Sequence, residues 1–233
     1  MNLTNRSYQK ELLDGDEIPF KDIEQNMREL EFINTHLGGH KITVAGLNKL
    51  IGEQKEIHVC EIGCGGGDNL TALLKWCNKK NIKINFTGID INQYCIEFAQ
   101  KNILLKNHVE WIVSDYKKIK FAEKPDIIFS GLFCHHFTDE ELVEQIKWMK
   151  ENCTIGFFIN DLQRNFLAYY SIKILTRLFS RSYLVKNDAP LSVARGFTKN
   201  EWINILKKAE VESIQIQWRW AFRYLITFRH NAK

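Results

Sequence analysis

A glycine-rich segment directly follows a short apolar run, and this arrangement limits the folds that are open to the chain. The run covers residues 57–62, and the glycine-rich segment, residues 63–67, separates it from a stretch with helical spacing that begins at Asp68. Glycines let a ligand pack against the main chain, and the first turn of a helix offers free N–H donors. The segment therefore predicts a strand, a ligand-binding turn and a helix.

Beyond this segment, strand-like runs alternate with helix-like stretches. The expected strands are 57–62, 83–90, 109–115, 125–131 and 153–161, and the expected helices between them are 68–79, 92–106 and one that begins near 138. This alternation predicts an α/β fold with a parallel sheet covered by helices on both faces.

The two ends of the chain have different patterns. Helical spacing at 16–36 and 40–51 predicts an N-terminal helical cap, residues 1–55, ahead of a core at 56–233. The core is expected to carry a helical insertion at about 164–197, with a turn-rich patch at 186–190, and then a capped helix at 198–209. Alternating residues from 211 to 230 predict two closing strands with a bend at 218–222.

Three acidic positions accompany the glycine segment. A dinucleotide-binding turn that starts at Gly63 requires glycine at position 68, where this chain has Asp68. Asp90 ends the second expected strand, where its two oxygens can bind a ribose diol, and Asp115 ends the third, where it can receive an adenine amino group. The alternative is that each acid only caps the turn or helix that follows it.

Together these residues carry a family resemblance. The pattern Glu61-x-Gly63-x-Gly65-x-Gly67, followed by Asp90 and Asp115, resembles class I S-adenosylmethionine-dependent methyltransferases. The resemblance implies a Rossmann-like, doubly wound, seven-stranded sheet, mostly parallel with a C-terminal antiparallel hairpin, plus N-terminal helices and an inserted helical lid. It also implies S-adenosylmethionine as cofactor. The glycine segment and Glu61 would contact its methionine and ribose portions, Asp90 its ribose and Asp115 its adenine.

A pair of histidines follows the fourth expected strand. His135 and His136 come at the edge of the sheet where the reactive methyl group is expected, and either is a candidate catalytic base for a hydroxyl acceptor. The alternative is that they only shape the pocket or cap a helix. We predict no metal site, because adjacent side chains diverge and no second ligand pair has characteristic spacing.

The insertion supplies the candidate substrate-binding residues, which are Arg164, Tyr169 and Arg195. Arg164 either orients the acceptor or belongs to the cap of the next helix, and Arg195 either binds an anionic group or forms a structural ion pair. The sequence from 161 to 197 resembles a bacterial small-molecule subgroup of the family that is related to quinone- and polyketide-tailoring enzymes.

One helix of the insertion places Lys173, Arg177 and Arg181 on a single face among apolar residues. A lid over a hydrophobic acceptor pocket, a peripheral membrane contact and ordinary core packing are all compatible with this pattern. Residues 160–233 carry 13 Lys and Arg against 5 Asp and Glu, so an anionic partner or a solvated basic surface is expected there.

Composition excludes several other classes. No apolar stretch reaches the ~18 residues of a membrane span. The six cysteines are scattered without a Cys-x-x-Cys pair, and no secretory signal precedes them, which favours a reducing, cytoplasmic location. The sequence lacks the Asn/Asp-Pro-Pro-Tyr/Phe motif of enzymes that methylate DNA bases, and it lacks a basic and aromatic binding module, so nucleic acid is not an expected partner.

We therefore predict methyl transfer from S-adenosylmethionine to a small hydrophobic acceptor, with O-methylation of a phenolic or enolic secondary metabolite as the leading hypothesis. Two alternatives stay open. One is C-methylation of a quinone precursor, and the other is a non-catalytic, membrane-associated protein that binds a nucleotide. The sequence does not specify the oligomeric state.

Overall fold

The computed structural model describes residues 3–15 and 17–231, and a single seven-stranded sheet forms its centre. The strand order is β3-β2-β1-β4-β5-β7-β6. The strands are β1 (Glu56–Ile62), β2 (Lys83–Asp90), β3 (Val109–Val113), β4 (Ile127–Gly131), β5 (Gly156–Leu162), β6 (Gln215–Arg219) and β7 (Arg223–Arg229). The first five are parallel, and β7 pairs antiparallel with both β5 and β6. The predicted Rossmann-like sheet with a closing hairpin is confirmed.

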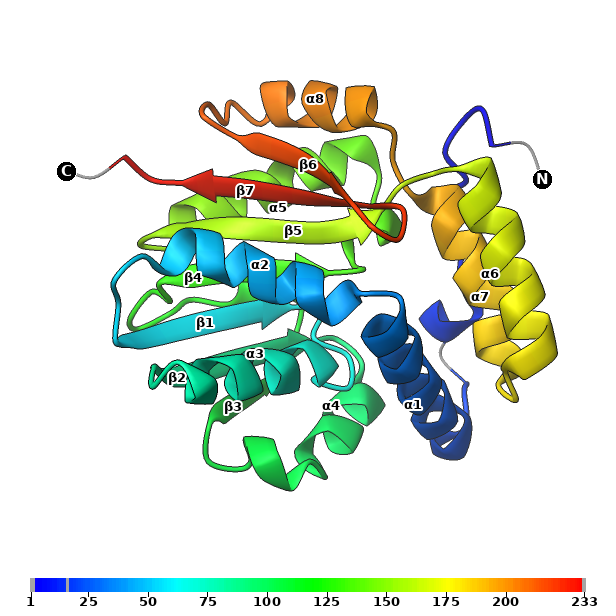
Figure 1. Cartoon of the computed structure of the whole chain (residues 1–233), viewed down its shortest axis with the longest axis horizontal. Helices are drawn as coiled ribbons and strands as arrows, with labels where there is room; N and C mark the ends of the chain where they lie inside the picture. Colours follow the sequence, from blue (N-terminus) through cyan, green and yellow to red (C-terminus); the bar gives the residue numbers. More distant parts are fainter. Residues whose placement is uncertain (1–2, 16, 232–233) are drawn as a thin grey trace.

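Helices cover both faces of the sheet and gather at one of its ends. They are α1 (Phe20–His36), α2 (Gly39–Ile51), α3 (Asp68–Lys79), α4 (Gln93–Gln100), α5 (Asp139–Asn152), α6 (Phe166–Phe179), α7 (Tyr183–Arg195) and α8 (Lys199–Lys208). Figure 1 shows α2 and α3 on one face and α5 on the other, whereas α1, α6 and α7 lie at the end toward which the parallel strands point. These three helices therefore surround the edge where the predicted site residues lie.

Three local expectations were wrong. Helix α6 ends at Phe179, so Arg181 lies outside the helix that was expected to carry it on one face with Lys173 and Arg177. The patch at 186–190 is not a turn, because α7 continues through it with Pro190 inside the helix. Both carboxylate oxygens of Asp188 accept backbone N–H bonds from Leu12 and Leu13, so this polar residue is paired with the N-terminal segment instead of initiating a turn. The helix expected at 92–106 ends at Gln100, and the Asn102 side chain caps a separate 3-10 turn after it.

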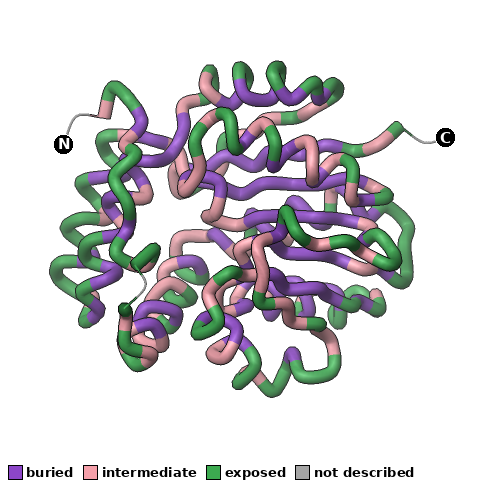
Figure 2. Tube along the Cα trace, turned by 180° about the vertical axis from the view of Figure 1, so that it is seen from behind, coloured by how far each residue is buried: buried purple, intermediate pink, exposed green. Residues whose placement is uncertain are grey.

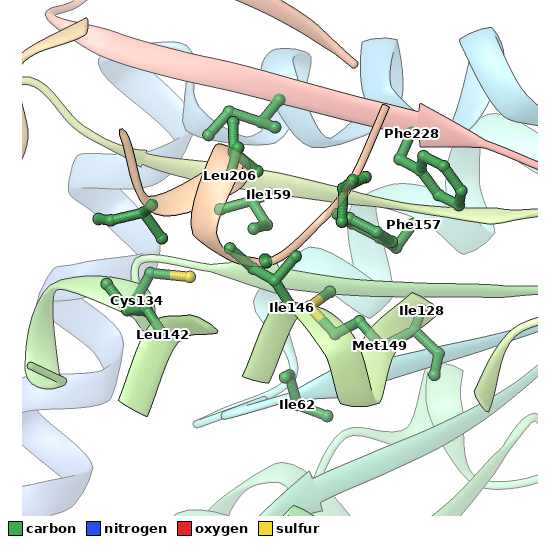
Figure 3. Packing of buried hydrophobic residues seen from close by; sticks show 14 of the residues in the cluster. Ile62, Ile128, Cys134, Leu142, Ile146, Met149, Phe157, Ile159, Leu206 and Phe228 are labelled. Carbon is green, nitrogen blue, oxygen red and sulfur yellow. The ribbon is translucent and has the colours of Figure 1, made fainter. Parts of the chain in front are cut away.

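Apolar side chains pack on both faces of the sheet. On one face, residues of α5 and α8 meet those of β4, β5 and β7, as Figure 3 shows for Ile146, Leu206 and Phe157. On the other face α2 packs so closely that a Cβ atom at Gly46 would lie 2.4 Å from the ring of Phe158. Figure 2 shows this burial as a continuous purple centre formed by the strands. Because α2 belongs to this packing, the domain boundary between residues 55 and 56 stays a prediction.

Candidate functional site

A cavity of about 1230 Å³ lies at the carboxyl edge of the parallel strands. The loops after β1, β2, β3 and β4 form its floor. Its walls come from α1, from the N-terminal segment before it, from α6 and α7, and from the turn between β6 and β7. Open parallel sheets bind ligands at this edge, so the fold itself places a site here.

The glycine loop after β1 needs its glycines for two reasons. Gly63 has φ +66°, and a Cβ atom there would lie 2.2 Å from the ring of Phe133. Gly67 has φ +73° and is the residue from which α3 begins. L-residues rarely adopt such angles, so these two positions require glycine. Gly63 and Gly65 line the cavity, whereas Gly67 does not, and its contact with a cofactor stays a prediction.

Asp90 braces this loop. One of its carboxylate oxygens accepts the Gly65 N–H at 2.8 Å, and the other accepts the Asn92 N–H at 2.9 Å. Burial raises the pKa of Asp90, although the two backbone donors oppose the increase. Each carboxylate oxygen has a second lone pair, and Asp90 lines the cavity, so it can still accept hydrogen bonds from a diol.

Asp115 caps a short turn and also lines the cavity. Its side chain accepts the Lys117 N–H at 2.9 Å and so caps the short 3-10 turn Tyr116–Lys118. The same residue lines the cavity next to Ser114. The cap is therefore observed, and contact with a base remains a prediction.

Glu61 is a buried acid with one unused oxygen. Its Oε1 accepts a bond from Asn69 at 2.8 Å, whereas Oε2 has no hydrogen-bond partner among the described residues. Burial, with Asp68 nearby, raises the pKa of Glu61 well above the ordinary range. A buried polar atom without a partner is costly, so this oxygen is suited to a cationic or hydrogen-bonding group of a ligand in the cavity.

The most distinctive polar group of the cavity wall is a buried pair of His135 and Asp161. Nδ1 of His135 lies 2.8 Å from Asp161, which also accepts the backbone N–H of His135 at 3.3 Å. Nε2 lies 3.5 Å from Glu11, a residue of the N-terminal segment. Burial alone would lower the pKa of His135, but Asp161 and Glu11 outweigh it and raise the pKa to about 9.

His136 occupies a more open position. Its Nδ1 lies 3.2 Å from Asp14 and its Nε2 lies 3.8 Å from Glu11. Glu11, His135 and His136 thus offer ligand atoms that all lie within 4.8 Å of one another, as a metal ion would require. The raised pKa means that a proton already occupies His135 at neutral pH, and a metal ion would have to displace it. The absence of a metal stays a prediction.

The three candidate substrate-binding residues have different positions. Arg164 is buried away from the cavity and forms a bidentate pair with Glu201, at 2.7 and 3.0 Å. Tyr169 is also buried and is not among the cavity-lining residues. Arg195 does line the cavity, but it donates to backbone carbonyl oxygens of Gln9 and His135. Substrate binding by these three residues stays a prediction. The ion pair with Glu201 favours a structural role for Arg164, which links the segment after β5 to α8.

Two site residues were missed by the sequence analysis. Glu11 reaches the histidines because the N-terminal segment folds over the cavity, and its carboxylate is held there by the Ser192 hydroxyl at 2.7 Å. Arg223 lies at the start of β7 and lines the cavity although it is almost fully buried. A local signal exists only for Arg223, as a basic residue beside the expected bend at 218–222.

A family model described as a methyltransferase domain matches residues 59–156, which is the segment that holds the glycine loop, Asp90, Asp115 and both histidines. No match was found among curated proteins.

Solved structures show the same fold. Human N-acetylserotonin methyltransferase in complex with S-adenosylmethionine is 15% identical with a TM-score of 0.64, over 92% of this chain and 57% of that protein. The plantazolicin methyltransferase BpumL in complex with S-adenosylhomocysteine is 21% identical with a TM-score of 0.61, over 84% and 72% of the two chains. A methyltransferase from Aquifex aeolicus is 16% identical with a TM-score of 0.61, over 91% and 98%.

Proposed function

We propose that the chain is a class I S-adenosylmethionine-dependent methyltransferase and that it methylates a hydroxyl group of a small hydrophobic acceptor. One observation supports hydroxyl transfer most directly. His135, oriented by Asp161 at 2.8 Å, lies in the wall of the same cavity that the glycine loop and Asp90 line. A hydroxyl nucleophile needs a proton acceptor beside the cofactor loop. His135 can fill this role once an acceptor displaces Glu11, because Glu11 helps to keep the imidazole protonated at neutral pH.

The residues of the loop fit the cofactor. The unpartnered Oε2 of Glu61 suits the ammonium group of the methionine portion, and Asp90 suits the ribose hydroxyls. Gly65 lines the cavity, and among the described residues, apart from its chain neighbours, the only atom within 4 Å of a Cβ placed there would be Met27 Sδ at 3.7 Å, so its main chain is open to a ligand. When bound, S-adenosylmethionine supplies an activated, electrophilic methyl group.

The protein then has to orient the acceptor and remove its proton. Asp161 holds the imidazole of His135 by Nδ1, so that Nε2 faces the cavity. An acceptor hydroxyl has to take the place of Glu11 next to Nε2, because Glu11 is the group nearest to it. While Glu11 is in place, the pKa of His135 is about 9, so the imidazole is protonated at neutral pH and becomes a base only when Glu11 is displaced or the pH rises. Phenols and enols are more acidic than aliphatic alcohols and therefore demand less of such a base.

The walls of the cavity suit an apolar acceptor. Side chains from α1 and α6, among them Leu30, Ile172 and Leu175, face the site together with Phe133 and Phe137. BpumL has also been crystallised with a monoazolic desmethyl plantazolicin analogue, which is consistent with small-molecule acceptors in this fold. We therefore infer a phenolic or enolic compound of mainly apolar surface.

A direct experiment is to incubate the protein with S-adenosylmethionine and a panel of phenols and enols, and to follow S-adenosylhomocysteine formation by mass spectrometry. We expect turnover of at least one hydroxyl acceptor by the wild type and a loss of about 100-fold or more in His135→Ala. Position-resolved NMR of the product separates O-methylation from C-methylation of a quinone precursor. Methyl transfer to carbon only, or full activity of His135→Ala, would argue against the hydroxyl mechanism.

Peripheral membrane contact is a second part of the proposal. Helix α6 exposes Phe166, Ile174, Leu178 and Phe179, and residues 166–181 contain Lys173, Arg177 and Arg181 but no acidic residue. Such a surface suits an anionic lipid headgroup region, from which an apolar acceptor can be drawn. The inner side of α6 lines the cavity through Ser171, Ile172 and Leu175. If methyl transfer were absent, this surface would instead support the non-catalytic, membrane-associated alternative.

No helix among residues 3–15 and 17–231 is both long enough and apolar enough to cross a membrane. The six cysteines are all free and buried. Unpaired cysteines agree with the proposed cytoplasmic location, since oxidising compartments favour disulfides.

A further inference from the structure

Arg223 is a buried cation with few partners. Arg223 is only 3% exposed. It is the first residue of β7, directly after the turn between β6 and β7, and it lines the cavity. Within residues 3–15 and 17–231, its side chain makes one hydrogen bond, from Nη2 to Asn34 Oδ1 at 2.9 Å. Among the residues that the structure describes, no carboxylate lies within 4.0 Å of its guanidinium. A guanidinium has five N–H donors, so most of them remain free for a ligand.

Arg223 stays protonated although it is buried. Burial lowers its pKa to about 10, while Asp161 and Asp68 oppose the decrease from a distance. Arg223 is therefore a cation at neutral pH. Buried guanidinium groups are normally matched by a bidentate carboxylate or phosphate, and this partner is missing from the described part of the chain.

Two acidic side chains, Asp68 and Glu61, lie on the other side of the cavity end that Arg223 lines. Asn34 accepts from Arg223 and donates to Asp68 at 2.9 Å, and Asp68 is the first residue of α3, directly after the glycine loop. The next residue, Asn69, donates to Glu61, whose second oxygen has no partner. One end of the cavity thus presents an unpaired cation and an unpaired acid near the glycine loop.

We propose that Arg223 binds the α-carboxylate of the methionine portion of S-adenosylmethionine, opposite Glu61. A zwitterionic amino acid head group supplies one carboxylate and one ammonium group, which complement these two buried side chains. The inference rests on the proposed function and adds a binding residue from outside the glycine motif. Arg195 is less suited to this role, because it already donates to two backbone carbonyl oxygens.

Calorimetric titration with two ligands tests the assignment. S-Adenosylhomocysteine carries the amino acid head group, and 5′-methylthioadenosine lacks it. We expect Arg223→Met to bind S-adenosylhomocysteine about 10-fold to 100-fold more weakly than wild type but to bind 5′-methylthioadenosine equally well. Arg223→Lys should lose less, because it keeps the charge but not the bidentate geometry. Arg229→Met, at the exposed end of the same strand, is the matched control and should bind both ligands as the wild type does.

Two results would overturn the assignment. One is that Arg223→Met binds S-adenosylhomocysteine within about twofold of wild type, and the other is that it weakens both ligands equally, as a general structural role would. A wild-type measurement does not depend on the folding of any variant: decarboxylated S-adenosylhomocysteine should bind about tenfold or more weakly than the intact ligand, and equal binding overturns the assignment. If the wild type binds none of these ligands, the proposed function fails together with the assignment.

Discussion

The imidazole of His135 lies 2.8 Å from the carboxylate of Asp161, and both side chains are buried at the end of neighbouring strands β4 and β5. His135 belongs to the 3-10 turn that follows β4, and Asp161 lies near the end of β5. Because the interaction is buried, it should contribute to the stability of the fold and, under the proposed function, to the reaction.

The first prediction concerns stability against pH. The folded-state pKa of His135, about 9, is above the unfolded value of about 6.5. Its contribution is therefore complete below the unfolded pKa and is lost as pH rises toward 9. Such a shift corresponds to at most about 3 kcal/mol. Urea unfolding at pH 6.5 and pH 9 should show this loss for the wild type.

The matched variant is His135→Gln, which retains a hydrogen-bonding side chain but does not titrate. Its free energy of unfolding should depend much less on pH over the same interval. An equal dependence in both proteins would show that another group causes the loss.

The second prediction concerns Asp90. Asp90→Ala removes an acceptor of two loop amides and the expected ribose contact, so S-adenosylhomocysteine should bind more weakly by about 1.5 to 3 kcal/mol. Calorimetry measures this, with Glu110→Gln on the exposed side of β3 as control. Unchanged affinity in Asp90→Ala would contradict the placement of the cofactor.

The third prediction separates steric from conformational demands at Gly63. Gly63→Ala should lower stability by about 1 to 3 kcal/mol, because φ is positive and Phe133 occupies the space of the new methyl group. The double variant Gly63→Ala/Phe133→Ala removes the clash but not the backbone strain. In the Phe133→Ala background, Gly63→Ala should lower the free energy of unfolding by less than it does in the wild type, but by more than zero. Chemical denaturation measures both differences. No difference between the two backgrounds would mean that the ring does not limit this position.

The fourth prediction concerns Arg164, which the sequence suggested for the acceptor and the structure pairs with Glu201. Arg164→Met should destabilise the protein by about 3 kcal/mol, because it breaks a largely buried ion pair and removes bonds to Leu3 and Gly196. The affinity of Arg164→Met for S-adenosylhomocysteine should be unchanged. Thermal unfolding measures the loss of stability, and calorimetry measures the affinity. A stable variant with altered acceptor preference would favour the substrate-binding role instead.

The sequence predicted those parts of the site that depend on local pattern. The glycine loop follows β1, Asp90 ends β2 and Asp115 comes two residues after β3, and parallel strands bring these ends to one edge of the sheet. The parallel sheet followed from the alternation of strand-like and helix-like segments. The closing hairpin followed from the alternating residues at 211–230 and from the family resemblance. These predictions needed no knowledge of contacts between distant segments.

The parts that were missed depend on such contacts. Glu11 lies in a polar segment without periodicity, and only the folded chain shows that it meets His135. The helical state of residues 186–190 also depends on the N-terminal segment, since Asp188 accepts bonds from Leu12 and Leu13. Tertiary pairing outweighs turn propensity there, and a single sequence contains no local sign of it.

The last prediction concerns the outer face of α6, which Figure 2 shows as largely exposed at the end of the molecule opposite the C-terminus. The protein should cosediment with vesicles of phosphatidylcholine and phosphatidylglycerol but not with phosphatidylcholine alone. The triple variant Lys173→Gln/Arg177→Gln/Arg181→Gln should lose about 1 kcal/mol of binding for each charge removed. Leu178→Ser should also weaken binding, because its side chain is 69% exposed and would insert among the lipids. The charge-matched control Lys75→Gln/Lys79→Gln/Lys80→Gln, on exposed positions of α3 and just after it, should bind as the wild type does. Equal losses in both triple variants would indicate attraction by net charge alone, and no binding of the wild type to anionic vesicles would exclude α6 as a membrane contact.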